Sequence, residues 1–186
     1  MKQVKKIFFA AVAILFVNAS FAQMEQTVMV GGAAMYPSKN IIENAVNSKD
    51  HTTMVAAVKA ANLVAILQTA GPFTVFAPVN KAFDMLPAGT VDNLLKPESK
   101  TALTGVLTYH VVAGKFTSMD LAKLIKEGNG TATLKTVAGG NLWVMMEGMK
   151  IAIKDQGGSV AYVTIKDVNQ SNGVIHVIDH VLLPKM

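Results

Sequence analysis

The spacing of the hydrophobic residues changes part-way along the chain. Before residue 128, apolar residues recur every three or four positions, as in amphipathic helices, and Leu103, Val106 and Leu107 form one such stripe. After residue 130 the period falls to two, and glycine-containing turns separate the apolar runs, which indicates strands. Helices followed by a meander of strands favour an α+β fold over a doubly wound parallel sheet.

The same pattern gives approximate bounds for the elements. We expect helices over residues 52–67, 80–86 and 91–95, from Pro97 onward, and between Ser118 and Gly128. The final apolar run is hydrophobic at odd and even positions alike, so we expect it to lie centrally in a sheet. The predicted strands cover residues 73–77, 109–112, 131–137, 142–146, 149–153, 160–165 and 174–183.

The stretch GPFTVFAPVNKAFDMLP, residues 71–87, joins a strand directly to a helix. Pro78 lacks a backbone N–H, so it ends strand pairing. Asn80 follows where the helix begins, and asparagine is a favoured residue for accepting the free N–H groups of a first helical turn. We therefore expect a structural corner without a reactive group, in which Asn80 caps its own helix.

The chain begins with the pattern of a secretory signal peptide. Three lysines precede an apolar run over residues 7–17, and Ser20 and Ala22 are small residues at the end of this region, as before a cleavage site. We expect residues 1–22 to be the signal peptide, residues 23–38 a poorly ordered N-terminal extension, and residues 39–186 a single domain.

Removal of the expected signal peptide changes what the charge implies. It takes away three lysines and leaves 14 basic and 12 acidic residues. The remaining sequence has no cluster of basic residues, which nucleic-acid binding usually requires. The chain contains no cysteine, so packing alone must hold an exported protein of this sequence together. Residues 23–186 contain no apolar run long enough to span a bilayer, and we expect the mature form not to span a membrane.

The candidate chemical motifs favour structural interpretations. HVIDH, residues 176–180, nearly matches an inverted zinc-protease pattern, but its β-branched neighbours favour a strand. On a strand His176 and His180 would lie roughly 13 Å apart, at about 3.3 Å per residue, too far for one zinc ion. Met145, Met146 and Met149 with Trp143 could suggest copper(I), but methionine also fills gaps in cores. We expect no metal, no cofactor and no enzymatic activity.

Three segments together resemble the fasciclin domain family. FTVFAPVNKAF is similar to the first family motif, GVIHVIDHVLLP to the second, and YHVVAGK, residues 109–115, to the central Tyr-His segment. The resemblance covers about residues 41–184. It implies a β-wedge of two twisted sheets flanked by several helices, and a role in adhesion or matrix interaction without catalysis. It also implies an interaction role for Tyr109 and His110, and a structural polar network of Asn80, His110 and His176.

These observations lead to one expected function and one alternative. We expect an exported, periplasmic or extracellular monomer that acts in adhesion or surface interaction with a protein, glycan or envelope component. The alternative is a carrier of a small apolar or lipid-like ligand, held in a gap between sheets and helices by the many Met and Leu residues. An undetected hydrolase is the weakest hypothesis, because no nucleophile and base are paired in a recognisable motif.

Overall fold

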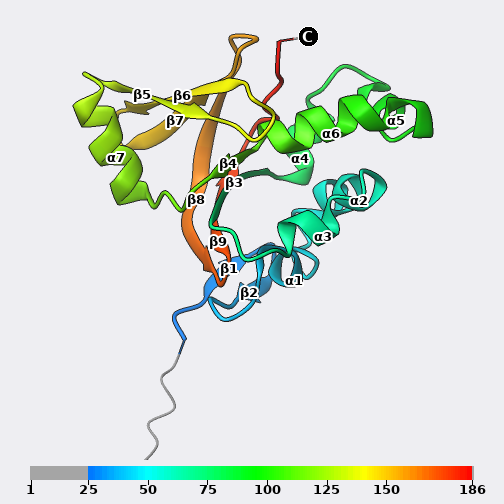
Figure 1. The fold of residues 1–186 in the computed structure, drawn as a ribbon, viewed down its shortest axis with the longest axis horizontal. Helices are drawn as coiled ribbons and strands as arrows, with labels where there is room; N and C mark the ends of the chain where they lie inside the picture. The colour runs from blue at the N-terminus through cyan, green and yellow to red at the C-terminus, as the bar shows by residue number, and fades with distance from the viewer. Residues whose placement is uncertain (1–24, 186) are drawn as a thin grey trace, which may run out of the picture.

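The computed structural model describes residues 25–185. The expected signal peptide, residues 1–22, lies outside the described residues. Within them, seven strands form one mixed sheet in the order β4-β3-β9-β8-β7-β6-β5 (Figure 1). Their bounds are β3 Phe73–Pro78, β4 Val111–Ala113, β5 Thr131–Lys135, β6 Asn141–Glu147, β7 Lys150–Lys154, β8 Val160–Gln170 and β9 Gly173–Ile178.

Strand β8 divides this sheet into two twisted halves. Its first residues pair with β7 and its remaining residues pair with β9, with irregular register near Ile165 and Val168. A bridge between Val112 and Thr136 then brings β4 to the end of β5, so the sheet curves nearly into a barrel. The expected α+β architecture with two twisted sheets is confirmed.

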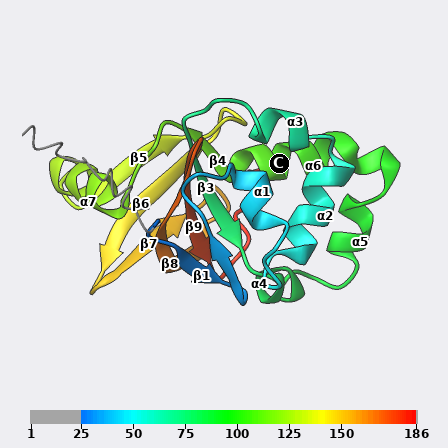
Figure 2. The same ribbon diagram turned by 90° about the horizontal axis from the view of Figure 1, so that it is seen from below.

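The helices lie on both sides of the sheet (Figures 1 and 2). Helices α1 to α6 gather on one side, and α7 lies on the other side against β5 and β6. The bounds are α1 Ile41–Ala45, α2 Thr52–Ala60, α3 Val64–Leu67, α4 Asn80–Asp84, α5 Thr90–Leu94, a 3-10 turn Pro97–Ser99, α6 Lys100–Tyr109 and α7 Ser118–Glu127.

The predicted single helix over residues 52–67 is wrong. Asn62 adopts the left-handed backbone region, with φ of 60°, and separates α2 from α3. Asparagine enters this region more readily than most residues, because its short side chain can hydrogen-bond locally. Ile66, near the end of α3, is half-exposed.

The expectation that residues 23–38 are poorly ordered is also wrong for residues 25–38, the part that the structure describes. Strands β1 Val28–Val30 and β2 Ala33–Met35 form an antiparallel hairpin around Gly31 and Gly32. Both glycines have positive φ, at 57° and 77°, as a tight two-residue hairpin turn requires. Val30 and Met35 are buried in the core, so the hairpin packs as part of the described fold.

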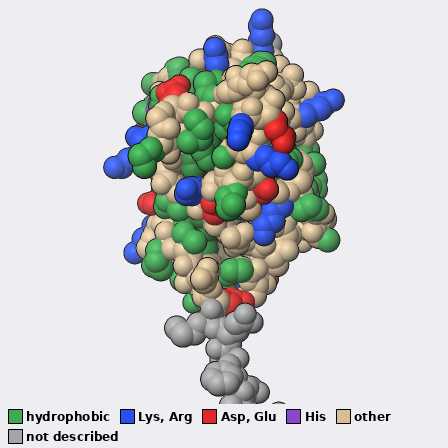
Figure 3. All heavy atoms as spheres, turned by 90° about the vertical axis from the view of Figure 1, so that its left-hand side faces the viewer, with side chains coloured by type: hydrophobic (Ala, Val, Ile, Leu, Met, Phe, Trp, Pro, Cys, Tyr) green, Lys and Arg blue, Asp and Glu red, His purple; other side chains and the backbone are tan. Residues whose placement is uncertain are grey.

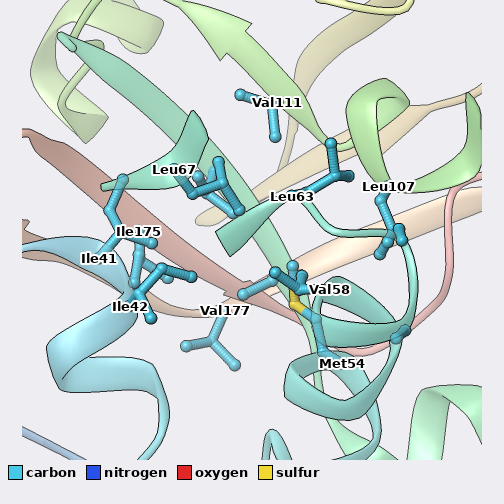
Figure 4. Close-up of a cluster of buried hydrophobic side chains, with 14 of the residues drawn as sticks. Ile41, Ile42, Met54, Val58, Leu63, Leu67, Leu107, Val111, Ile175 and Val177 are labelled. Carbon is cyan, nitrogen blue, oxygen red and sulfur yellow. The ribbon is translucent and has the colours of Figure 1, made fainter. Parts of the chain in front are cut away.

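Strand β9 separates two hydrophobic cores. Ile175 and Val177 lie in the first core, among side chains of α1, α2 and α3 (Figure 4). Ile178 belongs to the second core, with Phe76 and the inward side chains of α7 and β5 to β7. All six residues of β9 are buried, so the predicted central position of this strand is confirmed. The strand is shorter than expected: it ends at Ile178, whereas the sequence predicted that it would continue to residue 183.

Replacement of Val177 with Asp should strongly destabilise the protein. The new carboxylate would lie in the first core without a partner, because Val177 is only 1% exposed. An uncompensated buried charge costs on the order of 3–5 kcal/mol, a large part of the stability of a typical domain. Urea unfolding of V177D measures this loss, with V137D as a control because Val137 is half-exposed. Equal midpoints for the two variants would contradict the placement of β9.

Candidate functional site

Asn80 connects two helices that are separate in the sequence. Its Nδ2 donates to the carbonyl of Lys49 (2.8 Å), and its Oδ1 accepts from the backbone N–H of Thr53 (3.1 Å). Thr53 lies in the first turn of α2, whereas the residue before α4 is Val79. The expectation that Asn80 caps its own helix is therefore wrong, because the side chain instead caps α2 across the corner.

Tyr109 is the last residue of α6 and not the first residue of a strand, as the sequence predicted. Its side chain is 0% exposed. The hydroxyl donates to the carbonyl of Asn141 (2.7 Å) and accepts from the N–H of Gln156 (3.0 Å). Gly140 lies against the ring, since a Cβ there would come within 2.7 Å of it. Burial raises the pKa of Tyr109, so the phenol stays neutral and fixes β6 against the turn after β7.

His110 follows Tyr109 and links α6 to the C-terminal segment. One ring nitrogen, Nδ1, donates to the carbonyl of Val106 (2.8 Å), and Nε2 accepts from the N–H of Leu182 (3.0 Å). These two bonds assign a neutral imidazole with the proton on Nδ1. Burial lowers the pKa of His110 to about 4, which agrees with this neutral form.

The expected interaction role of Tyr109 and His110 needs correction. Their side chains are 0% and 2% exposed, and the polar atoms of both are already hydrogen-bonded to backbone groups. A partner therefore cannot touch either side chain in this conformation. Any contact in this region must involve neighbouring exposed residues.

His176 lies in β9, on the side opposite the first core. Its Nε2 donates to the carbonyl of Phe116 (2.8 Å), and its Nδ1 accepts from the N–H of Asp167 (3.3 Å). The ring stacks on Phe76 of the neighbouring strand, with centroids 5.8 Å apart. Burial lowers the pKa of His176. The imidazole thus connects β9 to β8 and to the segment that leads into α7.

Asn80, His110 and His176 share one kind of bonding. The ring and amide groups of all three bond to backbone groups from segments distant in the sequence. The described hydrogen bonds do not join the three side chains directly to one another. They are three separate links, each of which holds a different pair of segments.

Other buried or partly buried polar residues, which the sequence analysis did not single out, make similar links. Asn172 accepts from the N–H of Ile41 (3.0 Å) and donates to the carbonyls of Leu67 and Thr69. Asp167 accepts from the N–H of Ser118 (2.6 Å) at the start of α7. Asp155, Asn44 and Gln170 are buried, and Asn44 donates to Gln170, 126 positions away. Their partners are mostly far away along the chain, so no local spacing identifies these roles.

The structure separates the two histidines of HVIDH. His176 is buried in β9, whereas His180 follows the strand, is partly exposed, and contacts the carboxylate of Asp179 through Nδ1 (2.8 Å). Among residues 25–185, no group of three or more His, Asp or Glu side chains could hold a metal ion. The segment is a strand up to Ile178, so the helical zinc-protease interpretation has no structural basis.

The apolar cavity between the sheet and helices is small. It lies among the β1–β2 hairpin, α1, α2 and the central strands, and its volume is about 70 Å³. His51 is a buried residue in its wall, with Nδ1 2.9 Å from the Ser48 hydroxyl and no hydrogen-bond partner for Nε2 among the described residues. Burial lowers the pKa of His51. Ligand pockets usually hold about 300–1,000 Å³, so this volume does not support an interior carrier site.

Comparisons with known proteins agree with the fold and its motifs. A family model described as the fasciclin domain matches residues 49–184. The chain belongs to the fasciclin domain family. The matched region contains all three quoted motifs, and the hairpin and α1 precede it.

Individual relatives extend this result. The chain is 44% identical over 174 residues to protein sll1483 of Synechocystis, covering 91% of this chain and 88% of the relative. It is 31% identical over 165 residues to cell surface glycolipoprotein MPB83 of Mycobacterium bovis, covering 89% of this chain and 64% of the relative.

A solved structure shares the fold. It is a FAS1 domain pair from the insect cell adhesion molecule fasciclin I, with a TM-score of 0.69 and 20% sequence identity. The match covers 86% of this chain and 58% of that two-domain chain. In the described part of the fasciclin domain, no helix is both long and apolar enough to cross a membrane.

Replacement of Asn80 with Ala should weaken the start of α2 and not the start of α4. The variant removes the acceptor of the Thr53 N–H, and loss of such a cap costs on the order of 1 kcal/mol. Hydrogen exchange should show faster exchange of the Thr53 amide, together with a lower midpoint of unfolding. N80D keeps a side-chain oxygen and serves as the control. Unchanged protection of Thr53 in N80A would contradict the cross-corner cap.

The fasciclin domain should lose stability as the pH falls from about 6.5 towards 4. Unfolded histidine binds a proton near pH 6.5, whereas folded His110 does so only near pH 4, and burial also lowers the pKa of His51 and His176. The unfolded state therefore binds more protons in this range, so the free energy of unfolding decreases on acidification. The pKa difference of His110 alone contributes about 3 kcal/mol to the free energy of unfolding. This contribution is fully present above pH 6.5 and is lost as the pH falls towards 4.

NMR titration separates this effect from the titration of carboxylates. The ring C–H signals of His110 should change only near pH 4, and urea unfolding at several pH values should give the matching loss of stability. A His110 ring that titrates near pH 6.5 in the folded protein would exclude the proposed neutral link.

Proposed function

We propose that this fasciclin-domain protein is an exported, monomeric, non-catalytic surface-interaction protein. Its partner would be a surface protein, a glycan or another component of the cell envelope, and not a nucleic acid. Membership of the family is the observation that carries the proposal. The names of a cell surface glycolipoprotein and a cell adhesion molecule among its relatives support this class of function.

The state of the two buried histidines in the family motifs supports a role without catalysis. His110 and His176 use both ring nitrogens in hydrogen bonds to backbone groups, and burial lowers the pKa of both. A general base must reach a substrate proton directly or through water. Neither ring has a free nitrogen to do so, and neither is exposed.

An apolar surface lies beside the buried Tyr-His segment. Ile66 and Val137 are both half-exposed and, with Phe73 and Thr108, line a small hollow of about 30 Å³. The N–H of Val137 donates to the carbonyl of Val111 (2.8 Å), so this surface is attached directly to β4. We name Ile66, Phe73, Thr108 and Val137 the β4-side patch. It gives the region around Tyr109 and His110 an exposed apolar surface that the two residues themselves lack.

Affinity capture tests the proposed function. Purified protein on beads should retain a defined envelope component saturably, and soluble folded protein should compete for it. The double variant I66S/V137S should reduce the retained amount several-fold, because it removes apolar surface that a partner would bury. Its melting temperature should stay close to that of the wild type, since both side chains are half-exposed.

Unfolded V177D on beads serves as the control for non-specific adsorption. Retention of the same components by V177D, or no reproducible retention by the wild type, would contradict the proposed function. Undiminished capture by I66S/V137S would show that the partner does not bind at the β4-side patch.

A further inference from the structure

The face that carries α7 exposes methionine side chains to an unusual degree. Met149 is 98% exposed and Met119 is 82% exposed, the highest values among the large hydrophobic residues of the described chain. Figure 3 shows this face, where hydrophobic side chains lie interspersed with lysines. Scattered exposed hydrophobic residues are ordinary, but a group of them at one hollow suggests a binding site.

The exposed methionines surround a groove. The groove runs between the first turn of α7, the adjoining ends of β6 and β7, and the middle of β8, and its volume is about 410 Å³. Its floor includes the buried residue Ile151, which belongs to the second core. We name it the methionine groove and define it by five lining residues: Met119, Met146, Met149, Lys150 and Lys166.

The volume distinguishes this groove from the interior cavity. About 410 Å³ falls within the usual range of about 300–1,000 Å³ for ligand pockets, whereas the interior cavity has about 70 Å³. Methionine is unbranched and polarizable, so three methionines can adapt to the shape of an apolar chain. The groove therefore has both the room and the side chains for an extended apolar ligand.

The charged residues in the lining have one sign. Lys150 and Lys166 are exposed, and no Asp or Glu lines the groove. Asp167 follows Lys166, but its carboxylate accepts from the N–H (2.6 Å) and the hydroxyl of Ser118. The ammonium of Lys150 lies 5.8 Å from the ring centroid of Tyr162, a weak cation–π contact at an exposed site. Glu147, opposite Lys150 on the neighbouring strand, accepts from the Tyr162 hydroxyl (2.7 Å) and does not line the groove. Charge complementarity therefore favours an anionic ligand.

We propose that the methionine groove binds a single-chain anionic amphiphile, that is, a fatty-acid-like carboxylate. Its hydrocarbon chain lies against the three methionines and Ile151, and its carboxylate pairs with Lys150 or Lys166. Burial of hydrocarbon supplies affinity in proportion to the area removed from water, and the lysines select the charge of the head group. This site is independent of the β4-side patch and of any envelope partner.

Three ligands with the same chain and different head groups test the proposal. Isothermal titration calorimetry of the protein uses dodecanoate and dodecyltrimethylammonium below their micelle concentrations and dodecanol below its solubility limit. Dodecanoate should bind at one site per protein in the micromolar range. Dodecanol should bind about tenfold more weakly, as expected for the loss of roughly 1.4 kcal/mol of charge pairing, and the cation should bind more weakly still.

Two double variants separate the contributions of chain and charge. K150Q/K166Q should abolish the preference for dodecanoate over dodecanol. M119S/M149S should weaken both ligands about tenfold or more, because the hydrocarbon chain loses the apolar side chains that shield it from water. K81Q/M85S is the matched control, because it replaces an exposed lysine and an exposed methionine outside the groove. Lys81 lies on α4, and Met85 follows that helix directly. All three variants should keep the wild-type melting temperature.

Several results would overturn the proposal. One is equal affinity for the three head groups, and another is dodecanoate binding that both groove variants leave unchanged. A third is binding only at millimolar concentration. Sedimentation with phosphatidylglycerol vesicles in the absence of monomeric binding would assign the groove to a membrane surface, which also excludes the single-chain ligand.

Discussion

The structure depends on a central strand that has no face in water. Strand β9 pairs with β3 on one edge and β8 on the other, so both of its backbone edges are occupied. Its side chains enter the first core through Ile175 and Val177 and the second core through Ile178. Such a strand is stable only when both faces of the sheet are covered. The two groups of helices and the curved second half of the sheet supply that cover.

The polar residues among these layers act as links between segments. His176 and His110 use opposite tautomers: His110 has its proton on Nδ1 and His176 has its proton on Nε2. In each ring the other nitrogen accepts from a backbone N–H. Protonation would turn that acceptor into a donor that faces another donor, so the links depend on neutral rings. These hydrogen bonds therefore form only at pH values at which both buried imidazoles are neutral.

Sequence periodicity was sufficient for the order of the elements from β3 onward and for the central position of the last strand. The hydrophobic alternation after residue 130 depends on neighbours within each strand, and the glycine turns between strands are local signals. The Gly31-Gly32 pair was such a local signal too, because two adjacent glycines with positive φ form a hairpin turn. It was missed because the surrounding strands have only three residues each.

The long-range polar contacts had no comparable signal. Asn80 contacts a residue 27 positions away, and Asp167 contacts Ser118 at a separation of 49. The sequence correctly favoured a capping role for Asn80, but only the three-dimensional arrangement shows which helix it caps. The break at Asn62 is similar, since asparagine is compatible with both a helix and a left-handed residue. Local propensity cannot decide between such alternatives when tertiary contacts determine the outcome.

The burial of the family motifs changes where binding should be sought. Tyr109, His110 and His176 identify the fold because they hold distant segments together, and they are hidden for the same reason. Two family members can therefore share these residues and still differ in every side chain that a partner touches. Ile66 and Val137 on one side, and Met119 and Met149 on the other, are exposed and make few of the contacts that maintain the cores. Because these positions can vary without loss of the fold, they are where one scaffold can acquire different partners.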